Sequence, residues 1–198
     1  GLDLPKWTEK MAENDRSHSN QSQLVDPVGL GRRCRKPIVT AVHGITYTLG
    51  IELALSGDIV IAADNCRFSQ LEPARGIHAT GGATFRFVER GGWGNAMHHL
   101  LTCDEFDSAE ALRIGIVQEV VPVGRQLERA MEIAQQISEM APLAVQETKA
   151  SARRWLYEGS DACIEALGPV QAKLMASEDA QEGVASFIER RPAIFKGY

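Results

Sequence analysis

Short apolar runs separated by glycines fill the first half of the chain, and a longer periodic pattern fills the second half. The run at 37–44, PIVTAVHG, is rich in β-branched residues and ends at glycine, which predicts a buried strand. The run at 49–57, LGIELALSG, is apolar around its whole circumference, which is typical of a short buried helix. The run at 58–63 predicts a second strand, and a turn leads from it into a third at 66–70.

Beyond residue 82 the spacing of the apolar positions becomes helical. GGATFRFVERGG and WGNAMHHLLT predict short helices. SAEALRIGIVQEVVP predicts a helix with Ser108 at its N-cap, ending at Gly115, and then a strand. From about 125 the pattern is helical almost to the C-terminus. Strands alternate with helices before that point, so the sequence predicts the α/β class with an all-helical C-terminal third.

Composition limits the kinds of partner. The 198 residues are 44% hydrophobic and 24% charged, as in an ordinary globular domain. The net charge of −5 gives no reason to expect a nucleic-acid partner. The longest apolar runs are interrupted by Glu, Asp or Gly, so we expect no membrane span. The polar stretch at 14–33 predicts a surface loop.

The cysteines and the first residue bear on the compartment and on processing. The four cysteines form no C-x-x-C pair, which argues against a zinc site or a disulfide scaffold. Reduced thiols are typical of a cytosol-like compartment, and we expect a cytoplasmic protein without a signal peptide. Because the chain opens on Gly1 rather than Met, we expect it to be processed, trimmed or missing its beginning.

Several common motifs are missing from the sequence. It has no G-x-S-x-G, Walker A or H-E-x-x-H segment, and the lone G-x-G at 29–31 does not predict dinucleotide binding. His98 and His99 are adjacent on a predicted helix, so we expect them to point in different directions, at the surface or partly buried, and not to ligate a metal. His43 and His78 are isolated, and a structural role is expected for both.

Two carboxylates remain as candidates for chemistry. Glu52 lies inside the apolar helix, and Glu72 lies where a strand passes into a loop. A buried carboxylate needs a partner or a raised pKa, so periodicity alone leaves two readings open for Glu52. It is either a structural residue neutralised by Arg or backbone N–H groups, or a catalytic one. The N–H groups of Leu49 and Gly50 at the helix start could hold a developing oxyanion beside the two carboxylates, an arrangement suited to proton transfer next to a carbonyl.

At these residues the sequence resembles a known family. KPIVTAVHG, LGIELALSGDIVIAADNCRFSQLEPARGI, LLTCDEFDSAEALRIGIVQEVVP and SEDAQEGVASFIERRPAIFKG are similar to the successive motifs of the crotonase (enoyl-CoA hydratase/isomerase) superfamily. The resemblance implies an α/β fold with a crotonase-like ββα spiral core at 1–125, N-terminally incomplete in this chain. It implies a helical oligomerisation region at 126–198, with the protein assembled as a homotrimer or a dimer of trimers.

The resemblance also implies the reaction. Family hydratases add water to a trans-2-enoyl-CoA, and Glu52, Glu72 and the Leu49 N–H match their catalytic groups. A second N–H would come from an alanine just before Gly1. The implied substrate contacts are Gly1, Leu2, Asp3, Ile45, Gly50, Leu71 and Arg75. No metal and no separate cofactor is expected, since coenzyme A is part of the substrate. Alternatives that share the fold are double-bond isomerisation, thioester hydrolysis, C–C cleavage and a non-catalytic paralogue.

Two positions depart from the family pattern. Leu49 stands in what is commonly a glycine run, where its side chain would narrow the acyl pocket. Arg75 replaces an apolar residue, and a guanidinium close to Glu72 would lower the pKa of that carboxyl. The cations of the C-terminal ERRPAIFKG, Arg191 among them, suit either the phosphates of CoA or a solvated helix end.

Overall fold

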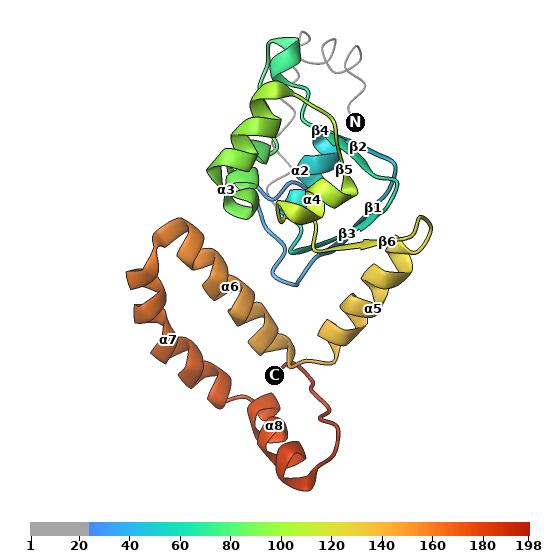
Figure 1. Ribbon diagram of the computed structural model, residues 1–198. Coiled ribbons are helices and arrows are strands. Elements are labelled where there is room, and N and C mark those ends of the chain that lie inside the picture. Colours follow the sequence, from blue (N-terminus) through green and yellow to red (C-terminus); the bar gives the residue numbers. More distant parts are fainter. Residues whose placement is uncertain (1–23) are drawn as a thin grey trace. The chain divides into compact units, whose positions relative to one another are not determined.

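A computed structural model describes residues 24–198 of the chain. These residues form two compact units. Unit 1 contains the residues up to Cys34 together with Ile38–Met131, and unit 2 contains Arg35–Pro37 together with Glu132–Tyr198. Figure 1 shows the strands gathered in unit 1, whereas unit 2 is helical.

Unit 1 holds two three-stranded sheets. One contains β1 (Val39–Val42), β3 (Ile59–Ala63) and β6 (Glu119–Val121), all parallel, in the order β1-β3-β6. The other contains β2 (Ile45–Tyr47), β4 (Arg67–Ser69) and β5 (Phe106–Asp107), with β2 parallel and β5 antiparallel to β4. The predicted strands are thus confirmed, and the sheet pairings show that β1 to β4 alternate between the two sheets.

The chain passes twice through a strand–strand–helix course. β1 and β2 are followed by α2 (Leu49–Ser56), and β3 and β4 are followed by the short 3₁₀ helix η2 (Pro73–Arg75) and by α3 (Ala83–Thr102). Because β3 pairs with β1 and β4 pairs with β2, the second pass lies beside the first in each sheet. This stacking puts the segment after β2 next to the segment after β4.

The core of unit 1 contains an aromatic cluster contributed by different elements. Phe68 of β4 stacks on Phe106 of β5 with 5.5 Å between ring centroids, and Phe87 of α3 meets Phe106 edge-on at 6.2 Å. All three rings are buried among the apolar residues of α2 and β3. Burial of large apolar side chains is the main favourable term in folding, so this cluster fixes α3 against the sheet.

Two details of the helices bear on the predictions. α3 is interrupted by Gly92, whose φ of 72° is not helical, in agreement with the two short helices predicted there. The predicted N-cap of α4 (Ser108–Arg113) is wrong by one residue, because Asp107 Oδ1 accepts from the Glu110 N–H at 2.9 Å. The hydroxyl of Ser108 instead donates to the Asp64 carbonyl. Both residue types can cap a helix, so the sequence alone did not decide between them.

α5 (Gln126–Ser138) begins in unit 1 and ends in unit 2. Unit 2 continues with α6 (Pro142–Glu158), α7 (Ser160–Met175) and α8 (Glu178–Glu189). α6 and α7 pack on each other, and Lys173 of α7 pairs with Glu147 of α6 at 2.8 Å. These helices confirm the helical C-terminal third.

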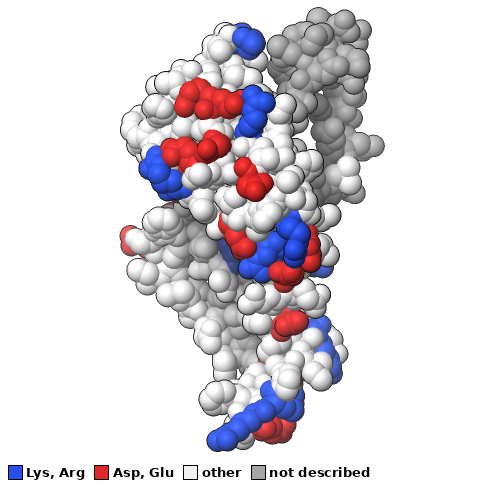
Figure 2. Space-filling view, turned by 45° about the vertical axis from the view of Figure 1, so that its right-hand side comes forward, with Lys and Arg blue, Asp and Glu red and all other residues white. Residues whose placement is uncertain are grey.

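The surface charge and the hydropathy of the described residues agree with what the composition predicts about nucleic acids and membranes. On the face that Figure 2 shows, blue cations stand beside red carboxylates, and neither sign covers a large patch. Among residues 24–198, no helix combines the length and the apolar character that crossing a membrane requires.

Candidate active site

The candidate site forms where two parallel strands end. β2 and β4 pair with Tyr47 opposite Ser69, so the segments that follow both strands leave the sheet at the same edge. After β2 the chain enters α2 at Leu49, and after β4 it reaches Glu72 within three residues. The carboxyl ends of parallel strands are a common place for ligand sites, because the following residues converge there.

The start of α2 presents backbone donors. The Thr48 N–H donates to the Ser69 carbonyl at 3.0 Å, which anchors the start of the helix to the end of β4. The N–H groups of Leu49 and Gly50 precede the first intrahelical hydrogen bond, so α2 leaves them without a carbonyl partner of its own. Together with the positive end of the helix dipole, they can stabilise a negative oxygen.

Thr48 is held in an unusual backbone conformation, with φ 49° and ψ −113°. A β-branched residue at positive φ is strained. We expect Thr48→Gly to raise the free energy of unfolding by about 1 kcal/mol, because glycine adopts this conformation without a Cβ clash. Urea unfolding measures the change. In the control Thr84→Gly, on the exposed face of α3, we expect a loss of roughly 0.5 kcal/mol. Equal losses in both variants would contradict strain at Thr48.

Glu52 is buried, with 4% of its surface exposed. Its Oε1 accepts from the Gly81 N–H at 2.5 Å and from the Ala83 N–H at 3.4 Å. These donors lie just before and at the first residue of α3, so the carboxylate sits at the positive end of that helix. Of the two partners considered from the sequence, Arg or backbone N–H groups, the structure shows backbone N–H groups.

Gly81 is held on both sides. Its N–H donates to Glu52, and its carbonyl accepts from Nη1 of the buried Arg86 at 3.0 Å. Nη2 of Arg86 also donates to the Gly29 carbonyl at 3.3 Å. A Cβ on residue 81 would lie 2.5 Å from Glu52 Oε2, so only glycine allows the backbone to approach the carboxylate this closely. Arg86 therefore fixes the turn that fixes Glu52.

Glu72 stands between η2 and the end of β4. Its Oε1 accepts from Nε2 of the buried Gln70 at 3.1 Å. Glu72 Oε2 and Gln70 Oε1 are both buried, and neither has a hydrogen-bond partner among the described residues. Buried polar atoms without partners are costly and are found most often where a ligand or water completes the site.

Burial raises the pKa of the Glu72 carboxyl, and the negative charge of Glu52 raises it further. The two carboxylates are thus close enough to repel. A carboxyl with a raised pKa exchanges protons more readily near neutral pH than an ordinary one. One carboxylate held by N–H groups beside a second with a raised pKa is an arrangement suited to acid–base catalysis.

The raised pKa has a consequence for stability. The fold favours neutral Glu72, so its contribution is full below the ordinary value of 4.5 and is lost as pH rises through the raised pKa. Glu72→Gln stays neutral and keeps an oxygen for Gln70. We therefore expect the variant to be more stable than the wild type at neutral pH, with the difference vanishing below about pH 4. Urea unfolding across this pH range measures it, and a less stable variant at neutral pH would contradict the burial of a charged Glu72.

The other predicted site residues are not all gathered here. Gly50 and Leu71 flank the two glutamates and are half-buried. Ile45 is exposed at the opposite end of β2. The exposed Arg75 donates to the Ala74 carbonyl, and it is not among the groups that shift the pKa of Glu72, so the lowering that its proximity would cause does not occur. The predicted contacts Gly1, Leu2 and Asp3 lie outside the described residues.

Two of the three C-terminal cations, Arg191 and Lys196, have carboxylate partners in unit 2. Arg191 binds Glu182 through two nitrogens at 2.5 and 2.8 Å, and also binds Glu189 at 2.5 Å. Lys196 lies 3.9 Å from Glu178. The Arg191 guanidinium is therefore already engaged at the end of α8.

Sequence reasoning missed three residues that hold the two glutamates: Gln70, Gly81 and Arg86. Gln70 carried a usable signal, since it is a polar residue directly after a buried strand. The Gly81-Gly82 pair indicated only the point after which the spacing of the apolar residues becomes helical. Arg86 had no signal, because charged residues are common on helices and only its burial reveals its role.

Known proteins resemble this chain along its whole length. The family model described as enoyl-CoA hydratase/isomerase matches residues 1–198. A crystal structure of a probable enoyl-CoA hydratase/isomerase from Mycobacterium abscessus aligns with a TM-score of 0.94 and 48% identity, covering 100% of this chain and 76% of that one.

Curated relatives are similar over most of this chain. Enoyl-CoA hydratase EchA19 of Mycobacterium tuberculosis is 31% identical over 99% of this chain and 74% of its own length. The short-chain-enoyl-CoA hydratase of Clostridium acetobutylicum is 35% identical over 79% of this chain and 60% of its own length. The chain thus spans between about three fifths and three quarters of these relatives.

Proposed function

The chain belongs to the enoyl-CoA hydratase/isomerase family and has its crotonase-like α/β fold, and from this we propose that the protein adds water to a trans-2-enoyl-CoA thioester. The observation that supports hydration most directly is the pair Glu52 and Glu72. Two carboxylates at one edge of the sheet can activate a water molecule and supply a proton, and burial together with the charge of Glu52 raises the pKa of Glu72. The relatives named as hydratases agree with this reaction.

In the proposed mechanism, Glu52 accepts a proton from water while the water oxygen bonds to Cβ of the substrate. The π electrons move to the thioester oxygen, giving an enolate. The Leu49 N–H at the positive end of α2 donates to that oxygen. Glu72 then gives a proton to Cα, which re-forms the thioester carbonyl. The addition leaves the proton from water on Glu52 and leaves Glu72 ionised, and transfer of that proton from Glu52 to Glu72 restores the starting state.

Gln70 and Gly81 hold the two carboxylates in this scheme. The Gln70 amide donates to Oε1 of Glu72, which leaves Oε2 without a hydrogen-bond partner among residues 24–198 and free to carry the proton. The Gly81 N–H donates to Glu52 and keeps its carboxylate in place. A preorganised site of this kind loses little energy to rearrangement during the reaction.

The assay is direct. Purified protein is mixed with crotonyl-CoA, and the absorbance of the conjugated thioester is followed. Hydration removes the conjugation and yields a 3-hydroxyacyl-CoA, which product analysis identifies. A shifted double bond in the product would indicate isomerisation instead, free CoA would indicate hydrolysis, and an unchanged absorbance with unchanged substrate would reject hydration.

The proposal extends to assembly and compartment. We propose that residues 126–198 mediate a homotrimer or a dimer of trimers. In its support, the C-terminal helices expose large apolar side chains, including Ile164, Leu167, Phe187 and Ile188, and Phe187 is 85% exposed. Light scattering on the purified protein measures the mass of the assembly.

All four cysteines are free thiols, which supports a cytoplasmic location.

A further inference from the structure

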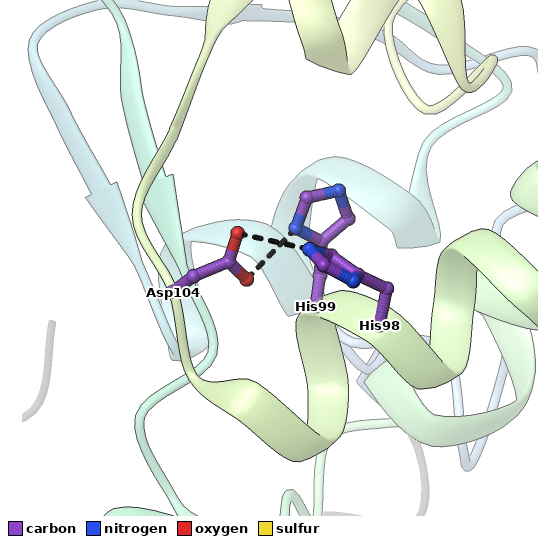
Figure 3. A group of neighbouring side chains, drawn as sticks. All are labelled: His98, His99 and Asp104. Atoms are coloured by element: carbon purple, nitrogen blue, oxygen red, sulfur yellow. Dashed lines mark hydrogen bonds and ion pairs between the residues drawn. The ribbon is translucent and has the colours of Figure 1, made fainter.

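A second cluster of side chains lies at the end of α3 and takes no part in the proposed reaction. Figure 3 shows the rings of His98 and His99 extending from the last turns of the helix toward the carboxylate of Asp104. His99 Nδ1 lies 2.9 Å from Asp104 Oδ1, and His98 Nε2 lies 3.5 Å from Asp104 Oδ2. One ligand atom from each residue lies within 4.8 Å of the others.

The two histidines leave the helix in different directions, as expected from their adjacent positions, since His99 is buried and the side chain of His98 is 63% exposed. They nevertheless reach the same carboxylate, because His98 uses its distal nitrogen and His99 its proximal one. Asp104, two residues beyond the helix, is the group that brings them together.

The buried histidine is already oriented as a ligand. Its ring packs against Phe106, with 4.1 Å between centroids, and its Nε2 lies 3.4 Å from Glu110 Oε1. Arg113 in turn pairs with Glu110 at 2.5 Å. Metal-bound histidines almost always donate their second ring N–H to a carboxylate in this way, which fixes the ring and makes the free nitrogen a stronger ligand. The contact between His99 and Glu110 therefore supports a metal-ligand role for His99 independently of the spacing of the three ligand atoms.

The carboxylate of Asp104 is likewise oriented by a neighbouring side chain. The Thr102 hydroxyl donates to Asp104 Oδ1 at 2.7 Å, which leaves Oδ2 directed toward His98.

We propose that His98, His99 and Asp104 bind a divalent transition-metal ion, with Zn²⁺ as the best-matched ion. Two imidazoles and one carboxylate are ligands that Zn²⁺ accepts, whereas Mg²⁺ and Ca²⁺ prefer oxygen ligands throughout. Ligand atoms around tetrahedral Zn²⁺ lie roughly 3.3 Å apart, given bonds of about 2.0 Å. The exposed His98 side chain can rotate to close the present spacing, and water fills the fourth position.

Isothermal titration calorimetry with ZnCl₂ tests the site, after chelator treatment and at constant neutral pH. We expect one Zn²⁺ per chain in the wild type, with at least a tenfold weaker affinity in His98→Ala and in Asp104→Asn. The matched control is His43→Ala, which removes an exposed histidine outside the cluster and should bind as the wild type does. Glu110→Gln should weaken binding less than the ligand variants. Because the readout is heat of binding, it does not depend on the proposed hydration activity.

A second measurement identifies the ligands. Cys103 lies between Thr102 and Asp104, so a thiolate is the rival donor. Co²⁺ in place of Zn²⁺ should give only weak visible bands, whereas an intense near-ultraviolet charge-transfer band that is lost in Cys103→Ser would assign the site to the thiolate and overturn the proposal. Zn²⁺ affinity unchanged in His98→Ala and Asp104→Asn, or no binding by the wild type, would overturn it as well.

Discussion

The Glu52→Gln variant is expected to hydrate crotonyl-CoA about 10²- to 10⁴-fold more slowly than the wild type, with little change in KM. An amide cannot accept a proton from water at neutral pH, so the step that forms the Cβ–O bond loses its base. The substitution keeps an oxygen that can accept the Gly81 N–H, and it keeps the side-chain volume. The loss should therefore fall on kcat while the thermal unfolding midpoint changes little.

The control for this experiment is Glu89→Gln, which removes an exposed carboxylate from α3 and should leave kcat unchanged. The Glu72→Gln variant should also lose activity, although it is expected to gain stability at neutral pH. Opposite effects on stability and activity would distinguish a catalytic carboxylate from a structural one. Wild-type rates in both Gln variants would contradict the assignment of the glutamates but leave the fold and the family unaffected.

The Gly81→Ala variant is expected to lose about 1–3 kcal/mol of unfolding free energy and most of its activity. The added Cβ would lie 2.5 Å from Glu52 Oε2 and 2.6 Å from its Cδ. Glu52 is buried and cannot swing into solvent, so either its carboxylate or the turn before α3 must shift. Both movements break the hydrogen bond that positions the carboxylate. Urea unfolding and the crotonyl-CoA assay measure the two losses.

Gly94→Ala is the matched control for Gly81→Ala. Gly94 lies exposed within α3, and a Cβ there meets nothing within 4 Å. Alanine should stabilise the helix by up to about 1 kcal/mol at this position, with no change in activity. If Gly81→Ala instead behaved like Gly94→Ala, the close approach of the Gly81 backbone to Glu52 would be wrong.

Local pattern predicted the elements of this protein well. The β-branched runs became β1 and β3, the apolar run around Glu52 became α2, and the helical period after 125 became α5 to α8. These elements follow from periodicity and glycine placement, which are properties of neighbouring residues. The single charge inside the apolar segment also identified Glu52 as a candidate site residue, because burying a carboxylate is costly whatever the fold around it.

The partners of those residues were decided only by the tertiary structure. Glu52 is held by Gly81, which is 29 positions away, and the two glutamates meet because β2 and β4 pair in parallel. The adjacent His98 and His99 converge because Asp104 lies beyond the helix that carries them. The sequence by itself therefore determined which segments are strands and helices and which carboxylate is out of place. Which groups meet depended on strand pairing and on the close approach of the Gly81 backbone, and these bring together residues that no local pattern relates.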